Sequence, residues 1–293
     1  MRPNTQKSVE VTRTAPSETI GNKTKKRARR SAEEGPIRTY LGSAWTVRLA
    51  SLSVVLVAWQ IVGSMLNPIF LSTPVKIVAA LVQLFANGEL LPALWLSLAG
   101  VAIGFAGGAL VGVTLGLIMG RWRRAEWALD PYVNALFVTP SVALIPILLI
   151  WFGIGFQAQL VIIFIGAVIP ITINTFAGVR NINREWIDAA RSFCANDRQI
   201  FLDVIIPGAV PHIMTGLRLG IGHAVISMVV AQMFLALSGL GQLLVVYGDF
   251  FKTAYVFAVV IVIGSIGVIL TECVKAADRH FAHWSRSDEG WSF

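Results

Sequence analysis

The sequence is poor in charged residues and in cysteine. Only 14% of its 293 residues are charged, 55% are hydrophobic and the mean hydropathy is +0.70, a balance that excludes an ordinary soluble domain. The two cysteines, Cys194 and Cys273, cannot build a disulfide framework or a metal cluster. His280 and His283 have the spacing of a metal pair, but no third ligand type accompanies them. We therefore expect a membrane protein without disulfides or bound metal.

Motifs for catalysis and for ATP binding are also missing. The sequence contains neither the phosphate-binding pattern G-x-x-x-x-G-K-[ST] nor H-E-x-x-H or G-x-S-x-G. We therefore expect no ATP hydrolysis on this chain and no intramembrane enzyme. Acidic residues are missing from the middle of every predicted span, and Glu272, near the end of the last span, comes nearest. This pattern disfavours a secondary transporter that works alone, but leaves it as an alternative.

Positive charge is concentrated at the start of the chain. Residues 1–40 hold four Lys and six Arg against four Glu, which accounts for +6 of the net charge of +8. Such a polar segment cannot bury enough apolar surface to fold alone. A basic run before a first membrane span is the usual topogenic signal, so we predict a disordered cytoplasmic tail over 1–44 and no nucleic-acid partner.

Six apolar segments are long enough to span a bilayer, which takes about 20 residues. They cover approximately residues 47–66, 93–119, 133–152, 157–178, 212–237 and 254–276. Lys and Arg are frequent in the tail, after the second and fourth segments and after the last, and nearly absent from the other connections. By the positive-inside rule, both termini are cytoplasmic. The sequence predicts an all-α polytopic protein with a transmembrane domain over 45–280 and a cytoplasmic tail over 281–293.

The second and third spans carry distinctive small residues and prolines. Glycine occupies positions 104, 108, 112, 116 and 120. Residues four apart share a helix face, so this strip predicts close packing against another helix. Pro140 and Pro146 interrupt the third span, which predicts a kink or unwound backbone facing protein or a water-lined cavity.

A charged segment, EWIDAARSFCANDRQIFLDVIIP at 185–207, lies between two apolar spans. Apolar residues recur at helical spacing from 200 to 205. Asn196 and Asp197 are suited to cap a helix there, and Pro207 to end it. The pattern predicts two short surface helices joined by a sharp turn. They either meet a partner or lie on the membrane as an amphipathic loop.

This segment resembles the cytoplasmic signature of the permease subunits of binding-protein-dependent ATP-binding-cassette importers. The signature is E-A-A, three residues, G, nine residues, I, one residue and L-P. Asp188, Ala189, Ala190 and Cys194 align with its first part and VIIP at 204–207 with its end, without a gap. FLSTP at 70–74, WFGIG at 151–155, IIPGAVPHIMTGLRLGIG at 205–222 and SGLGQLL at 238–244 resemble the nitrate, sulfonate and taurine branch. The resemblance covers roughly residues 47–280 and implies a type I importer permease fold.

In that family, the signature forms a coupling helix that docks on the ATPase. The resemblance therefore implies an ATPase-coupling role within the loop 180–211 for Glu185, Asp188, Ala189, Ala190, Arg191, Cys194, Ala195, Asn196 and Pro207. It also implies two partner ATPase subunits that carry ATP and Mg, a periplasmic or lipid-anchored solute-binding protein, and a second copy of this chain, all at a bacterial inner membrane with its lipid. The chain itself is expected to hold no cofactor. The implied solute is a small anion such as a sulfonate, taurine or nitrate, with bicarbonate, an aromatic carboxylate or a pyrimidine as alternatives.

Three positions depart from the family pattern. Asp188 replaces glutamate, which keeps the charge but shortens its reach. Cys194 replaces a glycine that is free to adopt a positive φ. A non-glycine residue there costs about 1–2 kcal/mol, so either the turn has a different shape or Asn196 takes the strain. Gln232 stands where relatives often have a glutamate, so an amide replaces a charge at mid-membrane.

Polar side chains within spans usually face a cavity or another helix. The candidates for a translocation pathway are Asn134, Thr139, Ser141, Asn174, Thr175, Arg218, His223, Ser227 and Gln232. His223 and Gln232 are nine residues apart and point in opposite directions on a helix, so at most one lines a given path. Arg218 either extends to the membrane interface or attracts an anionic solute.

Overall fold

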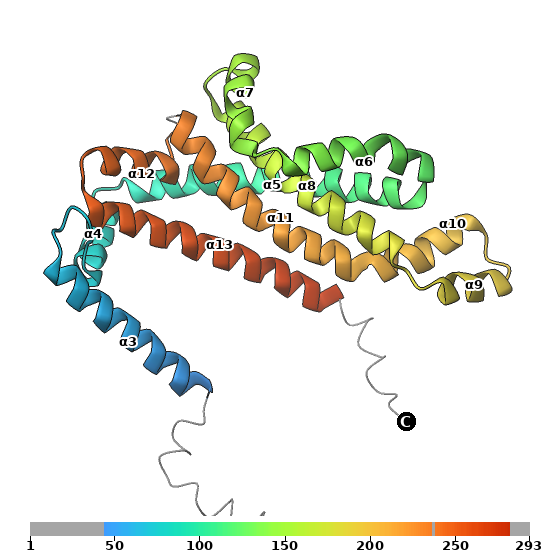
Figure 1. Cartoon of the computed structure of the whole chain (residues 1–293), viewed down its shortest axis with the longest axis horizontal. Coiled ribbons are helices and arrows are strands. Elements are labelled where there is room, and N and C mark those ends of the chain that lie inside the picture. Colours follow the sequence, from blue (N-terminus) through green and yellow to red (C-terminus); the bar gives the residue numbers. More distant parts are fainter. Residues whose placement is uncertain (1–43, 236–237, 282–293) are drawn as a thin grey trace, which may run out of the picture. The chain divides into compact units, whose positions relative to one another are not determined.

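The structure is a computed structural model that describes residues 44–235 and 238–281, and every regular element in those ranges is a helix (Figure 1). The all-α class expected from the sequence is therefore confirmed. The tails predicted at 1–44 and 281–293 fall almost wholly outside the described residues.

The chain divides into two units, the first ending at Ile61. Its described part belongs to α3 (Ala44–Met65), a helix of 22 mostly apolar residues. At 1.5 Å per residue such a helix extends about 33 Å, enough to cross the hydrocarbon core of a bilayer. The first predicted span is thus a helix of the expected length.

The second unit starts at Val62 and contains the remaining helices. They are α4 (Pro74–Ala86), α5 (Leu90–Arg121), α6 (Arg123–Val138), η1 (Ser141–Leu144), α7 (Ile145–Phe152), α8 (Phe156–Arg180), α9 (Arg184–Ser192), α10 (Asp197–Gln199), η2 (Ile200–Ile205), α11 (Ile206–Leu235), α12 (Leu240–Asp249) and α13 (Thr253–Phe281). Across both units, five described helices are long and apolar enough to span a membrane, and a bent pair makes a sixth candidate.

The glycine strip of α5 packs directly on α8. A Cβ added at Gly108 would lie 2.8 Å from the Cβ of Ala167, and one at Gly116 would lie 2.5 Å from the Cβ of Thr175. Real side chains do not approach so closely, so glycine is what allows the two backbones to meet. The residue numbers rise together, which makes α5 and α8 parallel. The predicted close packing is confirmed.

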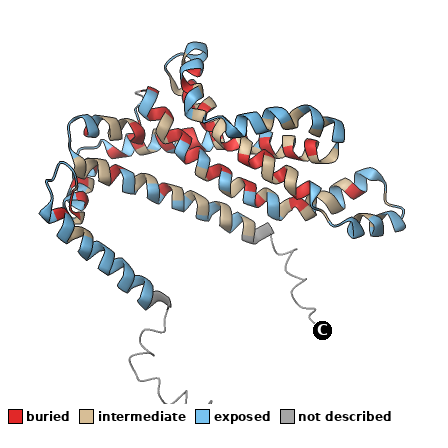
Figure 2. Cartoon of the chain, viewed as in Figure 1, coloured by how far each residue is buried: buried red, intermediate tan, exposed pale blue. Residues whose placement is uncertain are grey.

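The third core helix, α11, runs antiparallel to α8. Gly220 faces Ile171, whereas Gly166 of α8 faces Ser227 further along α11. The buried apolar residues shared by α5, α8 and α11 are Val101, Ile163, Ala167, Ile171, Ile221, Ala224, Val225 and Met228. Buried positions accordingly gather along these three helices (Figure 2). They form the core on which the other elements of the second unit are placed.

The third predicted span is broken. α6 and the segment Ser141–Phe152 meet at an angle of 97°. Pro140 lies at the break, and Thr139 before it is extended, with φ −75° and ψ 120°, because proline disfavours a helical residue ahead of it. The expected kink is confirmed, and the bent pair starts earlier than the predicted span over 133–152, since α6 already begins at Arg123.

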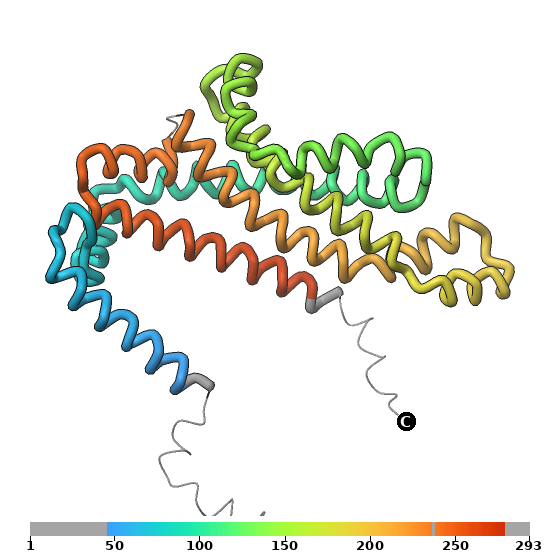
Figure 3. The backbone as a smooth tube through the Cα atoms, in the orientation of Figure 1, coloured from blue at the N-terminus to red at the C-terminus, as the bar shows by residue number. Residues whose placement is uncertain are grey.

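The sequence predicts that Pro207 ends a short helix, and this prediction is wrong. The helical segment that begins at Asp197 continues to Leu235 over 39 residues (Figure 3). Its portion Ile200–Ile205 is a π-helix, which directly precedes Pro207. Local π-helical turns accommodate proline within membrane helices because they rearrange the backbone hydrogen bonds. The charged segment is therefore one short helix joined to the start of a long one.

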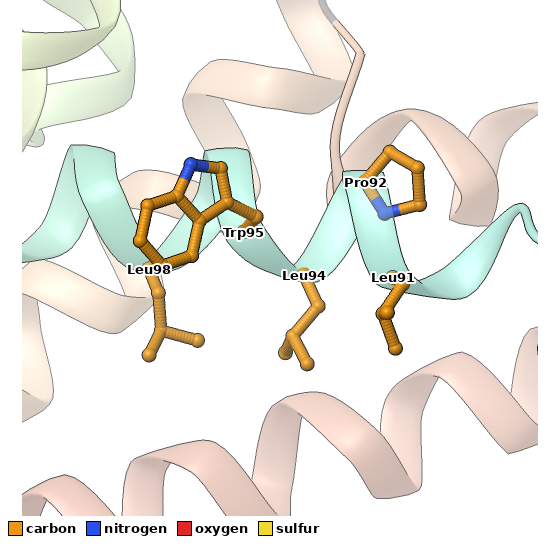
Figure 4. A pocket seen from close by; sticks show the side chains of 5 residues that line it. All are labelled: Leu91, Pro92, Leu94, Trp95 and Leu98. Atoms are coloured by element: carbon orange, nitrogen blue, oxygen red, sulfur yellow. The ribbon is translucent and has the colours of Figure 1, made fainter.

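An open hollow of about 480 Å³ lies at the start of α5 and is lined by Leu91, Pro92, Leu94, Trp95 and Leu98. Leu91, Leu94 and Leu98 point to one side of the helix (Figure 4). These side chains offer no charge to an anionic solute. The hollow suits contact with lipid or another apolar surface rather than solute binding.

Candidate functional site: a projecting helix and its turn

α9 begins with a side-chain cap. The Asn183 Oδ1 accepts a hydrogen bond from the backbone N–H of Glu185 at 3.0 Å. The Asn183 Nδ2 also donates to the Glu185 carboxylate at 3.2 Å. An acidic residue in the first turn is favourable because of the helix dipole. Sequence reasoning missed Asn183, although an Asn just before a helical pattern is a recognisable cap signal.

The turn after α9 is a Schellman motif. The N–H of Ala195 donates to the carbonyl of Ala190 at 3.1 Å, and the N–H of Cys194 donates to that of Arg191 at 2.9 Å. This hydrogen-bond pattern places its penultimate residue in the left-handed region, and Cys194 has φ 58°. The family glycine thus corresponds to the left-handed residue of a helix end. Of the two alternatives left open by the sequence, the strain falls on Cys194, since Asn196 has φ −77°.

The next helix begins with a capping box. The Asn196 side chain accepts from the N–H groups of Arg198 and Gln199, at 3.1 and 2.9 Å. The Gln199 side chain in turn accepts from the Asn196 N–H at 2.9 Å. These reciprocal bonds satisfy donors that the first turn of a helix leaves free. The predicted role of Asn196 as a cap is confirmed.

Arg121, at the end of α5, attaches the turn after α9 to the core. Its guanidinium lies 3.9 Å from the Asp197 carboxylate and 6.0 Å from the centre of the Phe201 ring. Nearby, Arg180 of α8 pairs with Glu126 of α6 at 3.3 Å. Exposed pairs of this kind contribute little individually. The Arg121–Asp197 pair nevertheless orients the base of the turn against α5.

The surface offered by α9 and its turn mixes charge with two large apolar side chains, Trp186 and Phe193. Asp188 and Arg191 pair at 3.6 Å with side chains 71% and 64% exposed. Phe193 is 88% exposed, the highest fraction among the large hydrophobic residues that the structure describes. Sequence reasoning missed Phe193 because it lies between the fixed positions of the signature. An apolar residue in an otherwise charged segment was the available signal.

The structure brings most of the predicted coupling residues together. Glu185, Asp188, Ala189, Arg191, Cys194 and Asn196 are exposed on α9 and its turn, whereas Ala190 and Ala195 are half-buried. Pro207 is exposed but stands apart, at the start of α11. No group of three or more metal-ligating side chains occurs within residues 44–235 and 238–281. The exposed residues of α9 and its turn therefore offer a surface for contact.

The predicted pathway residues do not share one surface. Asn134, Thr139 and His223 are exposed and Ser141 is half-buried. Their place in a pathway stays a prediction. The Nδ1 of His223 lies 3.0 Å from the Leu219 carbonyl, a bond within its own helix.

Other candidates are occupied inside the chain. Gln232, Ser227 and Thr175 are buried, and Asn174 donates to the Pro170 carbonyl at 2.8 Å. Gln232 and Ser227 consequently line no accessible surface in this conformation, and their place in a pathway stays a prediction. Because Gln232 is buried and His223 exposed, their predicted opposite orientation is confirmed.

Arg218 forms an ion pair with another helix. Its Nη2 lies 2.9 Å from the Asp278 carboxylate of α13, with the side chains 36% and 27% exposed. The guanidinium charge is thus matched by a carboxylate, and the pair ties α11 to α13. The two predicted roles of Arg218, extension to the interface and attraction of an anion, both stay predictions.

Comparisons with known proteins show the family of this chain. A profile described as "Binding-protein-dependent transport system inner membrane component" matches residues 112–286. The chain is 33% identical over 248 residues to the putative aliphatic sulfonates transport permease protein SsuC of Bacillus subtilis (strain 168), covering 84% of this chain and 90% of that protein. It is 30% identical over 246 residues to the taurine transport system permease protein TauC of Escherichia coli (strain K12), covering 82% and 90%.

The fold is shared with a solved transporter. A chain of the inward-facing MetNI methionine ABC transporter matches with a TM-score of 0.60 and 20% identity, covering 67% of this chain and 97% of that one. The fold and the projecting helix thus define a permease subunit of an ABC importer. The chain belongs to the family of inner membrane components of binding-protein-dependent transport systems. It is a multi-pass inner-membrane protein whose family implies ATPase and binding-protein partners.

Proposed function

We propose that this chain forms the path of an importer for a small sulfonate such as taurine, as a homodimer coupled to two ATPase subunits. The relatives at 33% and 30% identity are named for aliphatic sulfonates and taurine. ATP and Mg are held by the partner ATPase, and an external binding protein delivers the solute. The α9 end then faces the cytoplasm with both termini, and the α12 end faces outside.

One observation carries the coupling mechanism: the turn after α9 leads directly into the longest helix that the structure describes. The segment Asp197–Leu235 is continuous, and caps at Asn183 and Asn196 hold α9 and the turn in shape. A displacement applied to α9 by the ATPase therefore moves α11 along its length. This is a rigid-body version of alternating access.

The apolar arm around α7 supports a second copy as partner. In Figure 1 this arm leaves the bundle formed by α5, α8 and α11. Ile150, Trp151 and Ile154 are 81%, 72% and 76% exposed on it. An apolar arm that projects in this way is suited to a helix interface within the membrane, where a second copy completes the path.

The solute is tested with the complex isolated from the native host through a tag on this chain. After reconstitution into proteoliposomes, we expect ATP-dependent uptake of taurine or ethanesulfonate. Nitrate, bicarbonate, an aromatic carboxylate and a pyrimidine are the competing solutes. Uptake of one of these in place of the sulfonates contradicts the solute class. Uptake that needs no ATP contradicts the mechanism and favours the secondary transporter.

A further inference from the structure

The helix α12 begins without a cap of its own. Its N-cap residue is Gly239, which has no side chain, although the first N–H groups of a helix need acceptors. The Leu240 N–H donates to the Ser97 Oγ at 3.1 Å, and the Gly241 N–H donates to the Gln232 Oε1 at 3.0 Å. The Ser97 hydroxyl donates to the same Gln232 oxygen at 3.0 Å. Side chains from α5 and α11 thus cap α12.

This cap is fully enclosed by protein. Ser97, Gln232 and Leu240 each have an exposed fraction of 0%. Water therefore cannot replace a lost acceptor, and removing one leaves a buried N–H without a partner. The three bonds consequently stabilise one particular placement of α12 on α5 and α11.

Two glycines allow the close approach. A Cβ at Gly239 would lie 2.4 Å from the Cδ of Gln232, and a Cβ at Gly241 would lie 2.5 Å from the Val229 carbonyl oxygen. This close approach explains the two glycines in SGLG at 238–241. It lets the first turn of α12 rest against Gln232 and the backbone of α11.

The other end of α12 is also attached to α5. The Tyr247 hydroxyl donates to the Glu89 carboxylate at 2.5 Å, and Glu89 directly precedes α5. The Tyr247 ring stacks on Tyr255 of α13 with centroids 4.7 Å apart. Burial and the Glu89 carboxylate raise the pKa of Tyr247 to about 12, so the hydroxyl stays protonated and keeps donating. Figure 1 shows α12 alongside the start of α5.

We propose that Gln232 and Ser97 are positioning residues that make α12 move as one body with α11 and α5. Since α11 also continues from the coupling turn, a displacement of α9 then reaches the outer end of the path. The consequence for transport rests on the proposed function, whereas the cap itself does not. The cap requires an oxygen acceptor at position 232, because the Gly241 N–H and the Ser97 hydroxyl both donate to the Gln232 Oε1. A glutamate supplies that acceptor and a leucine does not.

Hydrogen exchange tests the cap directly in the purified complex. In Gln232→Leu we expect the Gly241 amide, which loses its acceptor, to exchange at least tenfold faster, and in Ser97→Ala the Leu240 amide for the same reason. In Gln232→Glu both amides should exchange within about twofold of the original rate. Ser227→Ala is the matched control, since it removes a buried hydroxyl of the same helix that has no bond to α12. Unchanged exchange in Gln232→Leu, or equal acceleration in Gln232→Glu, overturns the proposal. If Gln232→Leu fails to insert, Ser97→Ala replaces it with the same criterion.

Uptake and ATPase activity test the positioning role. We expect Gln232→Leu to lose at least 90% of solute uptake and of the ATPase stimulation by the binding protein. Its basal ATPase activity should stay within about twofold, and Gln232→Glu should restore uptake. Faster exchange at α12 with normal uptake overturns the positioning role. An incorrect solute class looks different, because the unmodified complex then fails to take up sulfonates while the exchange results stand.

Discussion

Two helices of this permease begin in opposite ways. The helix that starts at Asp197 is capped by its own neighbour Asn196, in a box closed with Gln199. The helix α12 is capped by Ser97 and Gln232, of which Ser97 lies 143 residues from the N–H that it receives. The first cap is exposed and the second is buried. The exposed turn, which we propose contacts the ATPase, has to keep its shape alone, whereas α12 takes its position from the core.

The difference between the exposed and the buried cap predicts how far the effect of a substitution extends through the structure. An exposed cap is worth about 1 kcal/mol, and water can replace part of it. A buried donor left without an acceptor costs about 1–3 kcal/mol. Changes around α12 should therefore affect the whole fold, and changes in the turn after α9 should affect mainly that turn and its contact with the ATPase.

The largest effect on stability is expected from Gly239→Ala. Its Cβ would lie 2.4 Å from the Cδ of Gln232, so either Gln232 or α12 has to move. We expect a loss of about 3 kcal/mol, the upper end of the cost of over-packing, measured by thermal unfolding in detergent. Gly248→Ala in the same helix is the control, because nothing lies within 4 Å of the added Cβ. Equal stability of the two variants would show that α12 is not held against Gln232.

The largest effect on the contact with the ATPase is expected from Phe193→Ala. Phe193 is 88% exposed and is held by a rigid turn, as is typical of residues that dominate an interface. We expect the affinity for the ATPase subunit to fall about 30-fold, or about 2 kcal/mol, with unchanged thermal stability. The neighbouring exposed change Ser192→Ala serves as control. Binding can be followed by titration of the ATPase in detergent, and unaltered affinity would exclude Phe193 from the contact.

A smaller effect is expected from Asn196→Ala. The variant removes the acceptor for the N–H groups of Arg198 and Gln199. We expect a local loss of about 1 kcal/mol, seen as faster hydrogen exchange over residues 197–200 without a change at α12. Acceleration that extends to α12 would remove the distinction between a self-contained turn and a dependent helix.

The smallest effect is expected from Cys194→Gly. Cys194 has φ 58°, which costs a non-glycine residue about 1–2 kcal/mol. Glycine relieves that strain but loses more backbone entropy on folding, so we expect a net gain of about 0.5 kcal/mol. Slower exchange of the Ala195 amide is the readout. A loss of protection there would mean that the cysteine side chain stabilises the turn.

Local signals made much of this structure predictable. The glycine strip, the break at Pro140, the cap at Asn196 and the glycine-like position of Cys194 each follow from residues a few positions apart. The continuation of the helix through Pro207 was not predictable in this way, because it depends on the π-helical turn at Ile200–Ile205.

The role of Gln232 depends on contacts that spacing does not contain. Its partner Ser97 is 135 residues away, and a polar residue at mid-membrane reads equally well as a pathway residue or a buried cap. Phe193 was missed for a related reason, since its exposure is a property of the folded turn. Most local structure could therefore be predicted from the sequence, whereas the partner of each buried polar side chain and the exposure of Phe193 could not.

The most direct test of α9 as the coupling element is ATP-dependent uptake by Asp188→Lys in the reconstituted complex. Asp188 is on the exposed face of α9 and pairs only weakly with Arg191, at 3.6 Å, so the variant should insert and assemble as a dimer. We expect ATP-driven uptake to be abolished, because the reversed charge disturbs the contact through which the ATPase displaces α9. Uptake at the original rate would contradict the assignment of α9 as the coupling element.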